Sequence, residues 1–205
     1  MRKASIKRKT NEVDIQGKLN IDGQGATKIS TSSEPLNHLL TLLAYWGLFD
    51  LELEAKGDLQ HHIIEDIGIA LGKSFKETLG DKAGINRLSA FSATMDKVVV
   101  EVSIDISGRP SLHGMTIDQG NKGLPDFLDN VTFDNTNFTA KHAQEFLEAF
   151  IQHAGLSLVY IIKSSKGDLH HILEALFKAL GKALDQATQI DPRRKGIPST
   201  KGIID

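Results

Sequence analysis

The chain has 205 residues, of which 40% are hydrophobic and 24% charged, and its formal net charge at pH 7 is −2. This composition is typical of a globular protein, and the balance of charge excludes the basic field that nucleic acids and anionic membranes attract. No apolar run is long enough to span a bilayer. The absence of cysteine excludes disulfides, thiolate nucleophiles and sulfur metal ligands. Because no apolar signal core follows the basic N-terminus, we expect a cytoplasmic protein. From the balanced charge and the lack of a membrane-spanning run, we expect no nucleic-acid or membrane partner.

The first half of the chain is predicted to form strands, then a helix, a strand and a second helix. Residues 1–31 alternate in the manner of strands, with a turn at 22–25. A helical pattern opens at His38 and ends at Gly47, and we expect Trp46 and the run 39–43 to lie in the core. A short apolar strand follows. Apolar residues at helical spacing then predict a helix from His61 to Leu79.

The second half has a similar order around a long insertion. Residues 98–106 have the pattern of a strand, and residues 120–137, rich in Gly, Asn and Asp, have the composition of an inserted loop. A helical pattern then ends at Gly155, and after a strand another helix is predicted from His170 to Ala187. The tail from residue 191 contains two prolines and cannot form a regular helix.

One segment occurs twice. Residues 56–65 (KGDLQHHIIE) run into 70–73 (ALGK), and residues 166–174 (KGDLHHILE) run into 179–182 (ALGK). A unit of about a hundred residues present twice indicates a fused duplication rather than a solenoid. We therefore predict an α+β fold of two pseudo-symmetric halves, each a sheet with helices on one face. The predicted divisions are residues 1–92, residues 93–190 and a C-terminal tail of residues 191–205.

The repeated histidines point to metal chemistry. On a helix, Glu65 shares a face with His61 and His62, whereas the two histidines diverge by about 100° and so favour different ions. The His-His-x-x-Glu motif occurs in two copies, which end in Glu65 and Glu174. Two such helices related by pseudo-symmetry would give each ion ligands from both repeats. Nitrogen and carboxylate ligands with open positions suit manganese or iron better than structural zinc.

Less specific interpretations also exist. Adjacent histidines can cap a helix or pack at an interface, but the pair occurs twice in matching contexts and uses four of the eight histidines. A single histidine such as His38 is more often structural than a ligand, and cations near turns, such as Arg87, Arg109 and Lys201, are usually solvated. Residues 198–202 (PSTKG) offer hydroxyls, backbone N–H groups and a cation for a phosphate, although disordered tails have similar compositions.

These motifs together resemble the imidazoleglycerol-phosphate dehydratases, the lyases of histidine biosynthesis. The resemblance covers nearly the whole chain. It rests on residues 8–12 (RKTNE), 37–40 (NHLL), 61–72 (HHIIEDIGIALG), 84–87 (GINR), 95–96 (MD), 105–110 (DISGRP), 170–179 (HHILEALFKA) and 197–202 (IPSTKG).

The resemblance implies a hydro-lyase that converts imidazole glycerol phosphate to imidazole acetol phosphate with two Mn²⁺ ions per chain. It further implies that the ions lie between subunits and that trimers assemble into a homo-oligomer of twenty-four chains. The implied metal ligands are His38, His61, His62, Glu65, His170, His171 and Glu174, with Glu145 where the family has a further histidine. The catalytic set comprises Glu12 as acid/base group, Glu65 and Glu174, and the substrate is held by Arg87, Arg109, Lys178, Ser199 and Lys201.

Several positions depart from the family pattern. They are Asn37 in place of an aspartate, a shortened approach at residues 59–61, Glu145, Val159 and the long insertion at 118–137. Two alternatives therefore stay open. The first is a related metal-dependent enzyme that acts on another small phosphorylated substrate. The second is a metal-stabilised assembly protein without catalysis.

Overall fold

The computed structural model describes residues 1–128 and 131–204. Each half contributes four strands and two long helices, and the insertion adds two short helices. The elements in chain order are β1 (Lys3–Lys9), β2 (Val13–Asn20), β3 (Thr27–Ser30), α1 (Glu34–Gly47), β4 (Asp50–Gly57), α2 (Gln60–Leu79), β5 (Leu88–Met95), β6 (Val98–Asp105), β7 (Ser111–Thr116), η1 (Ile117–Gln119), α3 (Leu124–Leu128), α4 (Ala140–Ala154), β8 (Ser157–Ser165) and α5 (Leu169–Thr188).

The two halves have the same sheet topology. The strand orders are β1-β2-β4-β3 and β5-β6-β8-β7. In each sheet the first three strands in this order pair antiparallel, and the last strand pairs parallel to its neighbour. The strands alternate between a buried and a more exposed face, most regularly in β6. This agreement confirms the predicted α+β fold of two pseudo-symmetric halves.

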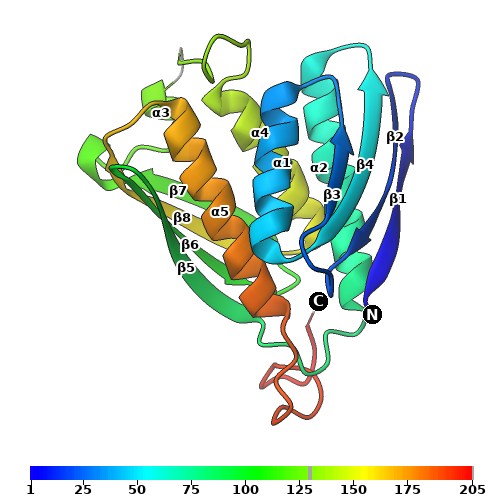
Figure 1. Cartoon of the computed structure of the whole chain (residues 1–205). Helices are drawn as coiled ribbons and strands as arrows, with labels where there is room; N and C mark the ends of the chain where they lie inside the picture. Colours follow the sequence, from blue (N-terminus) through cyan, green and yellow to red (C-terminus); the bar gives the residue numbers. More distant parts are fainter. Residues whose placement is uncertain (129–130, 205) are drawn as a thin grey trace.

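The four long helices lie between the two sheets (Figure 1). Helix α2 packs on β1 and β2, and α5 packs on β5 and β6. Helices of different halves also pack in pairs, α1 against α5 and α2 against α4. All four long helices begin at the same end of the molecule, and the C-terminal tail lies at the opposite end (Figure 1). Their N-terminal turns are therefore gathered at one end.

Two glycines of the repeated ALGK segment allow the helix pairs to approach closely. A Cβ on Gly72 of α2 would lie 2.6 Å from the carbonyl oxygen of Phe150 in α4. A Cβ on Gly181 of α5 would overlap the carbonyl oxygen of Leu43 in α1. A side chain at either position would push the helices apart. The repetition of this glycine thus has a packing cause at both interfaces between the halves.

The structure departs from the sequence expectations in three places. The boundary expected between residues 92 and 93 falls inside β5, which pairs with β6, so the second half begins before Leu88. The insertion contains η1 and α3 rather than loop alone. The expectation that Trp46 is a core residue is wrong, because its side chain is 42% exposed in the last turn of α1. None of the helices among the described residues is long and apolar enough to cross a membrane.

Candidate functional site

Three of the predicted ligands meet between α1 and α5. His38 Nε2 lies 2.8 Å from Glu174 Oε1, and His170 Nε2 lies 3.0 Å from the same oxygen. One ligand atom from each of the three residues lies within 4.8 Å of the other two. His38 comes from the first half and the other two residues from the second, so this α1/α5 cluster (His38, His170 and Glu174) forms where the halves pack.

Glu174 is the carboxylate of this cluster. Its side chain is 10% exposed, and Lys178 Nζ donates to its Oε2 at 2.6 Å. Burial by itself raises the pKa of this carboxyl, but the hydrogen bonds from Lys178, His38 and His170 together lower the pKa to about 2. Glu174 is therefore a carboxylate at neutral pH. Lys178, expected among the substrate-binding residues, lies beside the α1/α5 cluster.

Three further predicted ligands lie between α2 and α4. His61, Glu65 and Glu145 line a surface hollow of about 430 Å³. Glu145 Oε2 is buried and accepts no hydrogen bond from the described residues. Such an unpaired oxygen is costly unless a cation or water satisfies it. We name these three residues the α2/α4 cluster.

The two clusters are related by the duplication. Counted back from the C-terminal ends of α1 and α4, Glu145 corresponds to His38. The repeated motifs pair Glu65 with Glu174. Each cluster therefore takes one residue from the first long helix of one half (α1 or α4). The other two residues come from the second long helix of the other half (α5 or α2). A ligand set that recurs at both helix interfaces supports a pair of equivalent ion positions.

His62 and His171 belong to neither cluster, and each lies beside a carboxylate of the preceding turn. His62 Nδ1 is 2.8 Å from Asp58 Oδ1 and 3.9 Å from Glu12 Oε2. The hydrogen bond to Asp58 raises the pKa of His62 above its usual value. Glu12 was expected as an acid/base group, whereas no role was predicted for Asp58.

The second repeat has the same arrangement. His171 Nδ1 is hydrogen-bonded to Asp168, which also caps α5 by accepting from the His171 backbone N–H at 2.9 Å. His171 Nε2 lies 3.2 Å from Asp96 Oδ2. The hydrogen bond to Asp168 raises the pKa of His171. The repeated Lys-Gly-Asp-Leu was the signal that could have identified these aspartates as partners of the histidines.

Most of the predicted substrate-binding residues lie at the other end of the molecule. Arg87 donates to both carboxylate oxygens of Asp105, at 2.6 and 3.0 Å, and to the Pro198 carbonyl at 2.9 Å. The Arg87 backbone N–H bonds to the Ala187 carbonyl near the end of α5. His170 stands 17 residues earlier in that helix, about 25 Å away at 1.5 Å per residue. The turn with Arg109 and the tail with Ser199 and Lys201 lie at the same end as Arg87.

One departure from the family pattern, Asn37, has a local structural role, and so does His142 near Glu145. Asn37 Oδ1 accepts from the Thr31 backbone N–H at 3.0 Å and from the Thr31 hydroxyl at 2.7 Å, so its side chain fixes the turn before α1 rather than the His38 ring. His142, which precedes Glu145 by three residues, accepts from the Thr139 backbone N–H at 3.0 Å and caps α4. Burial lowers the pKa of His142.

Comparison with known proteins gives one consistent result. The sequence model of the family described as "Imidazoleglycerol-phosphate dehydratase" matches residues 31–184. A protein of that name from Thermoanaerobacter sp. (strain X514) is 47% identical over 207 residues, covering 100% of both chains. Another, from Bacillus licheniformis, is 44% identical with the same coverage.

Solved structures agree. The crystal structure of imidazoleglycerol-phosphate dehydratase from Staphylococcus aureus subsp. aureus N315 superposes with a TM-score of 0.76 at 29% identity, over 92% of this chain and 99% of that one. The Pyrococcus furiosus structure in complex with (S)-C348 gives 0.76 at 30% identity, over 96% and 99%. The match spans both halves, both helix interfaces and the repeated histidine motifs. The chain therefore belongs to the imidazoleglycerol-phosphate dehydratase family of hydro-lyases, as its motifs predicted.

Proposed function

We propose that this chain dehydrates imidazole glycerol phosphate to imidazole acetol phosphate, a step of histidine biosynthesis, with two divalent ions per chain. The observation that carries the proposal is the pair of duplicated clusters, one between α1 and α5 and one between α2 and α4. Family membership supports the reaction. The cytoplasmic location stays a prediction.

The residues of the α1/α5 cluster fit a divalent ion, and the α2/α4 cluster offers the same types of donor atom. The α1/α5 cluster brings two imidazole nitrogens and a carboxylate oxygen within 4.8 Å of one another. The α2/α4 cluster contains the unpaired oxygen of Glu145. This mixture of nitrogen and oxygen donors suits Mn²⁺ or a similar ion. A bound divalent ion would stabilise an anionic imidazole ring, which favours loss of the hydroxyl from the neighbouring carbon.

Dehydration also requires proton transfer. A C–H bond and a C–O bond break, so one group must accept the carbon proton and the departing hydroxide must be protonated to water. Glu12 suits the first task, because its carboxylate is exposed and lies beside His62. Glu174, with a pKa of about 2, suits ion binding rather than proton donation. Glu65, exposed in the α2/α4 hollow, is the second candidate for proton transfer.

We further propose that neighbouring chains complete each site. The phosphate-binding candidates Arg87, Ser199 and Lys201 lie about 25 Å from the histidine end of the same chain, too far for one small substrate to touch both. A homo-oligomer that places the tail of one chain near the histidines of another removes this difficulty. Twenty-four subunits built from trimers remain the predicted assembly.

Mixing of two inactive variants tests the shared site. His171→Ala removes a group at the histidine end, and Lys201→Ala removes one in the tail. If sites are shared, assemblies re-formed from both variants regain part of the activity, because some sites receive both intact surfaces. If each site lies within one chain, the mixture stays as inactive as the separate variants.

Turnover itself is tested with the Mn²⁺-loaded protein. We expect it to form imidazole acetol phosphate, to stop when a chelator is added and to recover when Mn²⁺ is restored. Glycerol phosphate without the ring should not react. Turnover of a different phosphorylated substrate in place of this one would favour the related-enzyme alternative. Ion binding and assembly without any turnover would favour the non-catalytic alternative.

A further inference from the structure

The insertion before α4 distinguishes the two halves. Only residues 31–33 separate β3 from α1, whereas residues 117–139 separate β7 from α4. The last part of this segment is a closed loop with a bridge between Thr132 and Thr139. The Phe133 N–H donates to the Phe138 carbonyl at 2.7 Å, and both rings are buried. The loop is therefore anchored, and what it presents to the helices is a fixed feature of the fold.

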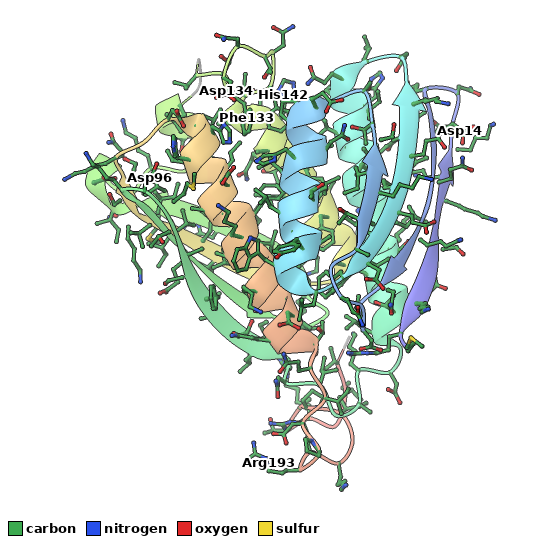
Figure 2. All side chains as sticks on the ribbon, viewed as in Figure 1. Asp14, Asp96, Phe133, Asp134, His142 and Arg193 are labelled. Atoms are coloured by element: carbon green, nitrogen blue, oxygen red, sulfur yellow. The ribbon has the colours of Figure 1, made fainter. Side chains whose placement is uncertain are left out.

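The loop presents two residues to His170 of the α1/α5 cluster. Phe133 stacks on the His170 ring with centroids 4.4 Å apart and an interplanar angle of 22°. Asp134 Oδ2 lies 3.0 Å from His170 Nδ1, and Oδ1 lies 3.2 Å from it. Figure 2 shows Phe133 and Asp134 above the end of the molecule where α1, α4 and α5 begin, with Arg193 of the tail at the far end. His170 is thus held at both its face and its outer nitrogen.

This contact fixes which ring nitrogen can bind an ion. Asp134 accepts from Nδ1–H, which leaves Nε2 as the nitrogen for the ion. Without an ion, Nε2 donates to Glu174 Oε1 at 3.0 Å, and a bound ion would take the place of that hydrogen. The pseudo-equivalent histidine, His61, has no carboxylate within hydrogen-bond distance among the described residues. Its ring contacts His62, at a centroid distance of 4.1 Å. The duplication therefore gives the two clusters similar ligands. Among the described residues, the insertion places a carboxylate beside the histidine of the α1/α5 cluster but not beside His61.

We propose that Asp134 is a positioning residue that orients His170 and makes the α1/α5 ion position the tighter of the two. This inference rests on the proposed use of two ions. Phe133 restricts rotation of the ring, and Asp134 selects the tautomer. The insertion, a departure from the family pattern, then serves to make two duplicated sites unequal.

The test is a Mn²⁺ titration of the assembled, ion-free protein, with free Mn²⁺ followed by electron paramagnetic resonance. Asp134 has φ +50°, so Asp134→Gly removes the carboxylate without backbone strain. Asp134→Asn keeps the side-chain size, tolerates this φ and leaves a weaker neutral acceptor. Asp126→Asn is the matched control, because Asp126 lies in the same insertion and, among the described residues, its carboxylate bonds only to the Gly123 backbone.

We expect one tight and one weaker ion per chain in the native protein. Asp134→Gly should weaken the tight site about 10–100-fold, the usual effect of losing a partner that orients a ligand histidine. Asp134→Asn should cause a smaller loss and Asp126→Asn none, with the same sizing profile for all. Unchanged Mn²⁺ affinity in both Asp134 variants would overturn this inference alone. A native protein that binds no ion would overturn the proposed two-ion function as well.

Discussion

Glu174 Oε1 lies 2.8 Å from His38 Nε2, although the two residues are 136 positions apart in the chain. They belong to different halves, and they meet because Gly181 lets α5 approach α1 closely. The α2/α4 interface repeats the arrangement with Glu65, Glu145 and Gly72. The ion-binding candidates are thus formed by the packing of one repeat on the other.

Glu174→Gln should reduce both ion affinity and stability. The variant loses the negative charge that Lys178 and two histidines contact. The half-buried ammonium of Lys178 is then left without a charged partner. We expect the ion-free protein to lose about 1–3 kcal/mol of unfolding free energy. Denaturant unfolding and Mn²⁺ titration measure the two effects. Glu77→Gln, at an exposed position near the end of α2, should change neither; equal effects in both variants would contradict a special role for Glu174.

Glu145→Gln should have opposite effects on stability and on ion affinity. Because Glu145 Oε2 is buried without a hydrogen-bond partner, neutralising it should stabilise the ion-free protein. The same change should weaken ion binding at the α2/α4 cluster. Glu145→His keeps a ligand, so it should retain ion affinity and raise turnover. A Glu145→Gln protein that is less stable without ions and binds Mn²⁺ normally would show that this carboxylate is structural.

Ion affinity should fall as the pH drops through neutrality. Hydrogen bonds to Asp58 and Asp168 raise the pKa of His62 and the pKa of His171, and an ion must displace the proton. The decline should therefore begin above pH 6.5, the usual histidine value. The ion-free protein follows the opposite trend, because a raised histidine pKa contributes stability that is present at lower pH and lost as pH rises through the raised value.

Asp58→Asn checks this assignment. Removal of the carboxylate lowers the pKa of His62, so the pH midpoint of Mn²⁺ binding should move down. Asp14→Asn, which loses only a surface pair with Lys9, is the control. An unchanged midpoint in Asp58→Asn would mean that His62 does not bind the ion.

Arg87→Lys should weaken substrate binding more than turnover. Lysine cannot reproduce the two-point contact with Asp105 and the third hydrogen bond to Pro198 that fixes the tail. We expect KM to rise about tenfold, or about 1.4 kcal/mol, with a smaller change in kcat. Arg193→Lys is the matched control, because Arg193 pairs with Asp191 on the exposed tail. A pure loss of kcat would place Arg87 nearer the chemistry than its position indicates.

Much of the architecture was predictable because the duplication is visible as repeated sequence motifs. The repeated KGDL and ALGK segments identified matching helices, and strand alternation identified both sheets. The meeting of His38 with His170 and Glu174 followed from the family resemblance, since periodicity places residues on a helix face but does not say which helix lies opposite.

Other features depended on tertiary structure. Nothing local to Asp134 shows that a long insertion returns to His170, because the direction of a loop is set by distant packing. Trp46 satisfied helical periodicity. Periodicity identifies the buried face of a helix, but not how far along the helix other elements pack on that face. The boundary between the halves was misplaced for a similar reason, because β5 is assigned by its pairing with β6 and not by its own pattern.

The most direct test of the two-ion lyase is the dependence of turnover on bound Mn²⁺. Ion-free protein is titrated with Mn²⁺, and bound ion per chain and conversion of imidazole glycerol phosphate are measured on the same samples. We expect no turnover without ions and full turnover as occupancy reaches two per chain. Full turnover in protein that elemental analysis shows to be free of divalent ions would contradict it, as would failure to bind any ion at neutral pH.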